Sequence, residues 1–209
     1  MCNLYSMTKP QDALRGLFKV NRDLTGNLPP LPGIFPDQMA PVVHADGNGG
    51  RTLEMMRWGF PPPPGGAGQP VTNIRNVASA YWRPWLTPRW RCLVPASSFC
   101  EYTDSAPKLP HWFGLDGDRS VFAFAGLWRP WSGLRKGETK EHRLFAFLTT
   151  EPNALVRPIH ARAMPVILGE AEWDRWLAAE TEDALALQRP LDPERLMIVS
   201  RGSKFDQPT

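Results

Sequence analysis

Proline is the residue type that most constrains how this chain can fold. The 209 residues include 23 prolines, which is about twice the share of roughly 5% that is usual in proteins. Proline interrupts both helix interiors and central strands, so we expect short elements joined by long ordered loops. The stretches 26–41 and 61–69, which combine proline with glycine, are predicted to be such loops.

Between these stretches, apolar residues recur mainly with the spacing of strands. Short helices are predicted at 10–18, 82–90, 170–179 and 183–187, and one helical turn at 153–156. Strands are predicted at 41–45, 53–58, 91–95, 99–102, 111–115, 121–128, 143–150, 163–168 and 196–199. The strands cluster in mid-chain without regular alternation with helices. The sequence therefore predicts one α+β domain over residues 1–209, with a curved, mostly antiparallel sheet core and short peripheral helices.

Composition and charge exclude several classes of protein. Hydrophobic residues make up 42% of the chain and charged residues 22%, which is typical of a soluble globular protein. No apolar run approaches the length of a membrane span. The first residues lack the basic and apolar stretches of a secretory signal, so a cytoplasmic location is expected. The net charge of +3 is compatible with a polyanionic partner but does not by itself indicate one.

The three cysteines, Cys2, Cys92 and Cys100, are too few and too scattered for a disulfide framework. No C-x-x-C or histidine-rich spacing indicates a metal, and no phosphate-binding or dinucleotide-binding loop is present in the sequence. We therefore expect neither a metal nor a cofactor. Cys92 lies in an apolar run that reads as a strand, so it is predicted to be a core residue.

Cys2 differs from the other two cysteines because of its position. Removal of Met1, which is usual when the next side chain is small, would leave an amine and a thiol on adjacent carbons. The reference pKa is about 7.7–8.0 for such an amine and about 8.5 for the thiol, so both have a reactive fraction near neutral pH. A 1,2-aminothiol condenses with aldehydes through a Schiff base and then a thiazolidine ring. Position alone does not establish this chemistry, since many proteins begin with Met-Cys.

Three further positions carry groups that could assist such chemistry. Asn73 and Arg75 lie in a polar patch, where an amide can orient an amine and a guanidinium can bind a phosphate. Glu101 follows an apolar run, and burial there would raise its pKa and suit it to acid–base work. His160, in the loop before 163–168, can transfer protons near pH 7. Taken separately, residues of these types are more often a solvated loop, a surface glutamate and a structural histidine than parts of a reactive site.

Several segments, read in order, resemble the SOS response-associated peptidase (SRAP) family. They span residues 1 to about 177, and their ordered combination is far more specific than any one of them. The segments are Met1-Cys2, Met56-Arg57-Trp58-Gly59, Asn73-x-Arg75, Arg91-Cys92-Leu93-Val94-Pro95-Ala96, Phe99-x-Glu101, Phe124-Ala125-Gly126-Leu127-Trp128, Leu148-Thr149-Thr150-Glu151-Pro152-Asn153-Ala154, and Ile159-His160-x-Arg162 followed by Met164-Pro165-Val166-Ile167-Leu168.

This resemblance implies a function as well as a fold. It implies a positively charged cleft for single-stranded DNA and a stable covalent link between the N-terminal cysteine and the aldehyde of an abasic site, which shields that site from strand breakage. Removal of Met1 would be autoproteolytic, and no cofactor or metal would be needed. By resemblance, the catalytic residues are Cys2, Asn73, Glu101 and His160, and the DNA contacts are Arg75, Thr149 and Arg162.

The sequence also departs from the family pattern at several places. Asn3 and Leu4 follow Cys2 where the family usually has glycine and arginine, and Asn76 and Val77 replace a usual alanine and glutamate. The loop after Gly59 lacks a tryptophan often found there, and one extra residue separates the arginine at 162 from the Met-Pro pair. The resemblance therefore implies a complete reactive centre within an altered DNA cleft.

Two other functions use the same residues. A cysteine hydrolase with an N-terminal nucleophile would use Cys2 and Asn73 on peptides or amides, and would need donors for an oxyanion. A noncovalent single-strand binder would use basic and aromatic side chains alone. All three hypotheses predict a soluble protein, but only the first predicts a covalent product with DNA.

Overall fold

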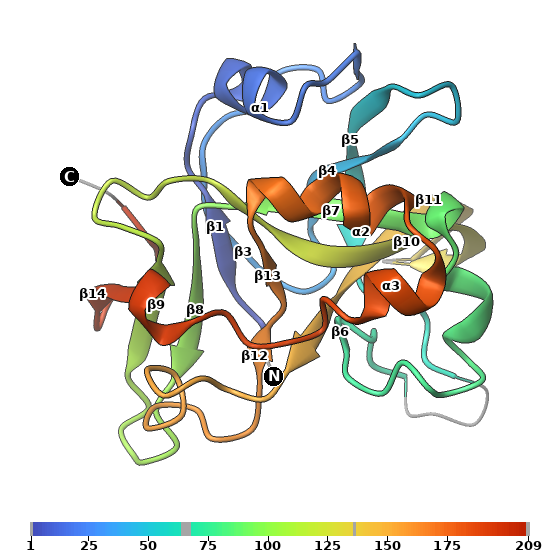
Figure 1. Cartoon of the computed structure of the whole chain (residues 1–209). Coiled ribbons are helices and arrows are strands. Elements are labelled where there is room, and N and C mark those ends of the chain that lie inside the picture. Colours follow the sequence, from blue (N-terminus) through green and yellow to red (C-terminus); the bar gives the residue numbers. More distant parts are fainter. Residues whose placement is uncertain (1, 64–67, 136, 208–209) are drawn as a thin grey trace.

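Two β-sheets form the centre of the computed structural model, which describes residues 2–63, 68–135 and 137–207 (Figure 1). The smaller sheet has five strands in the order β14-β9-β8-β1-β3. Its strands are β1 (Tyr5–Met7), β3 (Leu31–Ile34), β8 (Ser98–Tyr102), β9 (Pro110–Gly114) and β14 (Met197–Arg201). All four pairings in this sheet are antiparallel.

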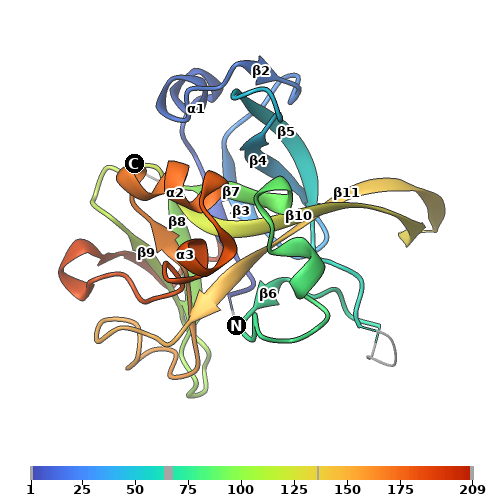
Figure 2. The same ribbon diagram turned by 45° about the vertical axis from the view of Figure 1, so that its right-hand side comes forward.

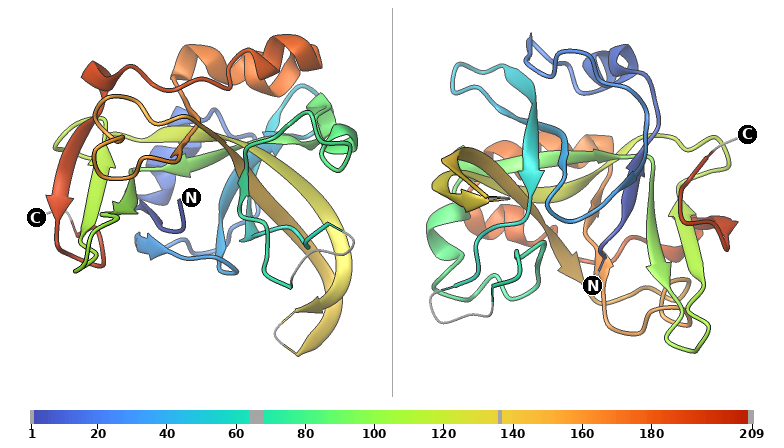
Figure 3. Two further views of the ribbon diagram at one scale, coloured as in Figure 1. Left: turned by 90° about the horizontal axis from the view of Figure 1, so that it is seen from below. Right: turned by 180° about the vertical axis from the view of Figure 1, so that it is seen from behind.

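The larger sheet has nine strands and curves round on itself (Figure 3). Its path runs β12-β11-β10-β7-β4-β5-β2, and an additional parallel pairing of β11 with β5 closes a ring of five strands. The strands are β2 (Arg22–Asp23), β4 (Met39–Ala45), β5 (Arg51–Trp58), β6 (Asn73–Ile74), β7 (Arg91–Ala96), β10 (Phe122–Arg135), β11 (Glu138–Thr150), β12 (Met164–Pro165) and β13 (Ile167–Leu168). Only the pairings β2–β5, β5–β11 and β6–β11 are parallel among those described. The predicted α+β fold with a curved, mostly antiparallel core is confirmed.

The helices are short and lie on the outside, as predicted. They are α1 (Gln11–Leu17), α2 (Trp173–Ala178) and α3 (Thr181–Leu185), with 3-10 turns η1 (Arg83–Trp85), η2 (Pro88–Trp90), η3 (Glu170–Glu172) and η4 (Pro193–Arg195). On α2, the indole of Trp176 donates a hydrogen bond to the Cys92 carbonyl at 2.9 Å. The Trp173 ring stacks on Phe18, with centroids 4.3 Å apart. The apolar face of α2 thus packs across β7, and Cys92 is a core residue as predicted.

Three expectations about individual elements were wrong. Residues 26–41 are not one loop, because β3 and the start of β4 lie within them. The proline in β3 is tolerated because β3 is the last strand of its sheet, where a missing N–H donor leaves no ladder bond unmade. The β10–β11 hairpin extends well beyond the predicted strands at 121–128 and 143–150. The predicted strand at 163–168 is divided into β12 and β13, which pair with different neighbours.

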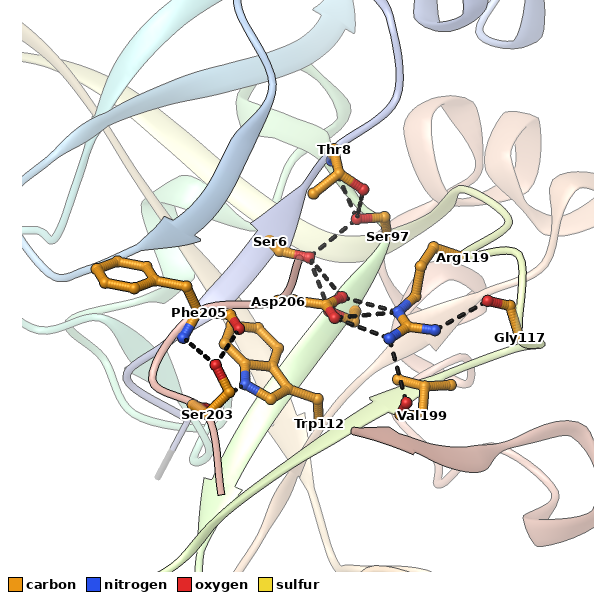
Figure 4. A network of polar contacts seen from close by, with 11 residues as sticks. Ser6, Thr8, Ser97, Trp112, Gly117, Arg119, Val199, Ser203, Phe205 and Asp206 are labelled. Atoms are coloured by element: carbon orange, nitrogen blue, oxygen red, sulfur yellow. Dashed lines mark hydrogen bonds and ion pairs between the residues drawn. The ribbon is translucent and has the colours of Figure 1, made fainter. Parts of the chain in front are cut away.

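A buried carboxylate ties the C-terminal segment to β1 and β8 (Figure 4). Asp206 is 0% exposed, and its side chain accepts hydrogen bonds from Ser98 at 2.5 Å and from Ser6 at 3.4 Å. The Arg119 guanidinium donates to both carboxylate oxygens, with Nε and Nη2 each within 2.9 Å of one of them. Because Ser6 belongs to β1 and Ser98 to β8, one carboxylate fixes these two strands against each other.

Asp206→Ala should therefore destabilise the protein strongly. The substitution leaves the Arg119 guanidinium buried without its counter-ion, and breaking a buried ion pair in this way typically costs about 3–5 kcal/mol. Urea unfolding followed by tryptophan fluorescence measures the change. Asp118→Ala is the matched control, since Asp118 is exposed and surface substitutions usually change stability by less than about 0.5 kcal/mol. A loss below about 1 kcal/mol for Asp206→Ala would contradict this assignment.

Candidate functional site

Four chain segments bring the predicted reactive residues to one place. Cys2 lies three residues before the start of β1, and Glu101 lies in β8, which pairs with β1. Asn73 begins β6, which pairs with β11, and His160 lies in the loop between β11 and β12. The structure thus brings together all four residues that the resemblance named as catalytic. Their chemical roles stay predictions.

Asn73 is hydrogen-bonded to the backbone of Cys2. Its amide nitrogen donates to the Cys2 carbonyl at 2.8 Å and to the Thr72 hydroxyl at 2.8 Å. The amide oxygen Oδ1 is buried and accepts no hydrogen bond from any residue within 2–63, 68–135 or 137–207. Buried polar atoms normally have hydrogen-bond partners. Asn73 Oδ1 can therefore accept a hydrogen bond from a donor that comes close to Cys2.

Glu101, which is buried, and His160, which is half-buried, form a pair close to Cys2. Glu101 is 3% exposed, and its Oε2 lies 3.9 Å from His160 Nε2. The pKa of Glu101 is raised to about 8, mainly by burial; the positive N-terminus opposes this rise and the Asp104 carboxylate adds to it. Burial lowers the pKa of His160. Near neutral pH the pair therefore consists of a mainly protonated carboxylic acid and a neutral imidazole, which can pass a proton between them.

The Cys2 thiol is kept in its protonated form. The residue is 0% exposed, and its Sγ lies 3.5 Å from the Leu4 carbonyl oxygen. Burial, and then the Glu101 carboxylate, raise the pKa of this thiol well above its usual value. A cysteine that attacks first as a thiolate needs the opposite shift. The environment of Cys2 therefore favours chemistry in which another group attacks before the sulfur does.

Two cavities form a cleft along this cluster. One, of about 480 Å³, is lined by Asn3, Glu101, Tyr102, Thr103, Asp104, Lys108, His160 and Arg162. The second, of about 470 Å³, is lined by Asn3, Leu4, Phe35, Pro36, Gln69, Pro70, Thr72 and Tyr102. Asn3 and Tyr102 border both, so the cavities adjoin each other there. Each has the size of a typical small-molecule site and could hold one nucleotide.

The three predicted DNA contacts have different surroundings. Arg162 is exposed and lines the cleft beside His160. Arg75 is half-exposed, with its guanidinium 3.5 Å from the Glu151 carboxylate, so it lies at the surface near the cluster. Thr149 is 1% exposed and pairs with β12. The structure therefore gives Thr149 no surface for a DNA contact, because β11 is covered on both sides at that point.

The structure shows the surroundings of Leu4, which departs from the family pattern, and of Gly59, which matches it. Leu4 is buried in a small apolar cluster with Cys100 and Trp112, where an arginine would not fit. Gly59 has φ +124°, and a Cβ there would lie 2.6 Å from the Pro70 side chain on the cleft wall. The loop predicted at 61–69 includes residues 64–67, which lie outside the described part of the chain.

Sequence reasoning missed other residues of the site. Lys108 places a cation in the cleft, although it lies in a loop with no motif around it. Gln188 donates hydrogen bonds to the carbonyls of both Arg75 and Thr149. The Tyr5 hydroxyl is buried without a hydrogen bond from the described residues, and burial followed by Cys2 raises its pKa well above the usual value. Only Tyr5 had a recognisable feature, its place within three residues of Cys2.

Within residues 2–63, 68–135 and 137–207, no three His, Cys, Asp or Glu side chains are grouped so that they could hold a metal ion. No helix in that part of the chain has the length and apolarity needed to cross a membrane.

Known proteins resemble the chain in sequence along most of its length. The family model described as SOS response associated peptidase (SRAP) matches residues 1–201. "Abasic site processing protein YoqW" of Bacillus subtilis (strain 168) is 30% identical over 203 residues, which cover 92% of this chain and 87% of that protein. "Abasic site processing protein YoaM" of the same strain is 31% identical over 205 residues, covering 92% and 86%.

Solved structures resemble the chain in fold. A crystal structure of a Bordetella bronchiseptica protein has a TM-score of 0.77 at 22% identity, covering 96% of this chain and 98% of that one. A Bacteroides thetaiotaomicron protein has a TM-score of 0.74 at 20% identity, covering 94% and 90%. At these identities the likeness concerns the fold alone. Because the family model spans almost the whole sequence and includes all four clustered residues, this chain belongs to the SOS response associated peptidase family.

Proposed function

We propose that this protein recognises abasic sites in single-stranded DNA during the DNA damage response and crosslinks to them through Cys2. The observation that carries the proposal is one cluster of residues: Asn73 is hydrogen-bonded to Cys2, whose buried thiol is protonated, and the paired Glu101 and His160 line the cleft. The names of the relatives support the choice of substrate, since YoqW and YoaM are described as abasic site processing proteins.

The first step is removal of Met1. Water adds across the Met1–Cys2 peptide bond, methionine leaves, and Cys2 gains a free amine. Glu101 assists this hydrolysis as an acid or base, so that the step is autoproteolytic. The unpaired Asn73 Oδ1 suits the product, because it can accept a hydrogen bond from the new amine while Nδ2 keeps its bond to the Cys2 carbonyl.

The second step generates the aldehyde. An abasic sugar exists mainly as a ring, which opens when its ring oxygen is protonated and the C1′ hydroxyl loses its proton. Glu101 holds a proton near neutral pH, and His160 lies next to it at the cleft. His160 can relay that proton to the ring oxygen, and general acid catalysis of this kind typically contributes about 10²–10⁴-fold in rate.

The third step forms two bonds to C1′. The Cys2 amine attacks the aldehyde carbon, water leaves, and a Schiff base results. The thiol then adds to the same carbon, its proton moves to the nitrogen, and a thiazolidine ring closes. The net reaction joins protein and DNA with the loss of one water. The raised pKa of the thiol agrees with this order of events, because the sulfur stays protonated until the imine is in place.

Cationic side chains around the cleft bind the phosphates of the DNA strand. Arg162 and Lys108 line the cleft itself, and Arg75 lies at the nearby surface, where it can hold a flanking phosphate. These contacts are independent of base identity, as recognition of a site without a base requires. With Leu4 buried where the family usually has an arginine, noncovalent affinity should depend on these three cations.

A denaturing gel tests the proposal. Mature protein mixed with a single strand carrying one abasic site should give a band that survives heat and detergent, and its intact mass should equal protein plus oligonucleotide minus one water. The same strand with an intact base should give none, since it offers no aldehyde. Retardation in a native gel without any covalent band would support the noncovalent binder instead. Turnover of fluorogenic amides without a DNA adduct would support the hydrolase.

A further inference from the structure

Tryptophan and arginine side chains form a continuous ladder on a surface outside the cleft. The Arg129 guanidinium lies 4.2 Å from the centre of the Trp85 ring. Trp85 meets Trp90 edge-to-face at 5.4 Å, and Trp90 meets Trp128 in the same way at 5.2 Å. The guanidinium of Arg143 lies 5.5 Å from the Trp128 ring. We call these five residues the Trp–Arg ladder.

Separate elements build this ladder. The η1–η2 segment carries Trp85 and Trp90, β10 carries Trp128 and Arg129, and β11 carries Arg143. Figure 2 shows the η1–η2 segment (green) beside the base of the β10–β11 hairpin, and both turns contact β10. Cation–π pairs occur roughly once per 70–80 residues in proteins. Finding two of them linked through three touching tryptophans is therefore a local concentration rather than ordinary packing.

A cavity of about 720 Å³ opens at the Trp128 end of the ladder. Its lining includes Trp128, Arg143, Arg89, Arg22, His44 and Leu177. Arg89 also lies over the Trp90 ring at 4.7 Å, which connects the cavity to the middle of the ladder. None of the residues that line the cleft lines this cavity. Its volume suits a nucleotide, and its lining combines cations with aromatic and aliphatic surface.

Buried contacts hold the cationic part of this cavity in place. Glu54 is 6% exposed, and its Oε1 accepts a hydrogen bond from Arg143 at 2.7 Å and lies 3.4 Å from His44 Nε2. The Arg143 side chain is nevertheless 48% exposed and lines the cavity. The one acidic residue in the lining, Asp46, accepts backbone hydrogen bonds from Asn48 and Gly50. The cavity is therefore preorganised for an anion.

From this arrangement we infer that the Trp–Arg ladder and its cavity bind a nucleoside phosphate, as a second site separate from the cleft around Cys2. The base stacks against the tryptophan and guanidinium planes, and the phosphate is bound by Arg143, Arg89 or Arg22. The bound nucleoside phosphate is either a free mononucleotide or part of a DNA single strand. The inference does not depend on the chemistry of Cys2.

Binding of a labelled single strand with intact bases tests this inference. The double variant Arg89→Glu/Arg129→Glu should bind fluorescein-labelled dA20 at least about tenfold more weakly at about 0.1 M salt, since the Arg89 phosphate contact and the Arg129 guanidinium over Trp85 are both lost and both charges are reversed. The double variant Arg195→Glu/Arg201→Glu makes the same change in net charge at exposed arginines outside the ladder. It should bind within about threefold of the parent protein. Equal affinity of the ladder variant and the parent, or equal loss in both variants, would overturn the inference.

Two further measurements separate the sources of the ligand and the two sites. Calorimetric binding of dAMP that is lost in the ladder variant identifies the free nucleotide as a ligand, whereas weakened dA20 binding without any dAMP binding assigns the site to a strand. Crosslinking of an abasic trinucleotide, which carries only one nucleotide on each side of the abasic site, should be the same in both double variants. Failure of that crosslink in the parent protein would count against the proposed function and leave the second site standing.

Discussion

Cys2→Ala should abolish the heat-stable DNA product completely. The variant keeps an N-terminal amine after Met1 removal but lacks the thiol that closes the thiazolidine ring. A Schiff base through the alanine amine can still form, and it hydrolyses on heating unless it is reduced. The expected result is no band on a denaturing gel without reductant and a weak band after borohydride. Intact mass distinguishes the reduced amine from a thiazolidine.

The chain provides a matched control for this experiment. Cys100 is 1% exposed and, like Cys2, has a pKa raised by burial, but it has no adjacent amine. Cys100→Ala should therefore crosslink at the rate of the parent protein, provided that it folds. To keep processing of Met1 out of the comparison, each variant is released from a fusion tag that leaves residue 2 as the first residue. If Cys2→Ala gives as much heat-stable product as the parent, the thiazolidine mechanism is wrong.

The spacing of apolar residues along the sequence was sufficient to predict individual strands and helices. The apolar run around Cys92 predicted a core strand, and the spacing of apolar residues within 170–179 predicted a short helix, whose Trp173 and Trp176 are buried; both predictions are confirmed. β3 was missed because its edge position, which makes its proline harmless, depends on how the sheet is ordered. Asp206 was missed for a related reason. Its partners Ser6 and Arg119 are far away in sequence, and it lies beyond the residues 1–201 that the family model matches.

In the candidate site, too, the sequence predicted which residues take part but not the contacts that depend on distant parts of the chain. The position of Cys2 could be read directly, and the order of motifs identified Asn73, Glu101 and His160 as its companions. What the sequence could not give is the environment of these groups. The raised pKa of Glu101 comes from burial in β8 beside β1, and the contact with His160 requires a loop some 60 positions later to return to that strand. Lys108 and Gln188 had no motif to identify them, because their roles arise only from the packing of loops around the cleft.

Glu101→Gln should slow crosslinking by about 10²–10⁴-fold, the range expected when a general acid or base is removed. In the parent protein, the rate should rise with pH as the Cys2 amine loses its proton, which has a reference pKa near 7.7–8.0. It should fall again as Glu101 loses its own proton at a pKa of about 8, because the ionised carboxylate can no longer donate. The profile is therefore bell-shaped, and its alkaline side belongs to Glu101. Single-turnover rates on an abasic single strand, measured from about pH 5 to pH 10, give both limbs.

The neighbouring carboxylate allows a finer test of the same assignment. Asp104 is exposed, lies 4.0 Å from His160, and its charge raises the pKa of Glu101. Asp104→Asn removes that charge, so the alkaline limb should move to lower pH while the maximal rate changes little. Glu101→Gln should instead lose the alkaline limb altogether, since glutamine does not titrate. If the Glu101→Gln protein keeps an alkaline limb at the same pH, another group supplies the proton. If Asp104→Asn moves that limb upward, the electrostatic link between the two carboxyl groups is not the one that the structure indicates.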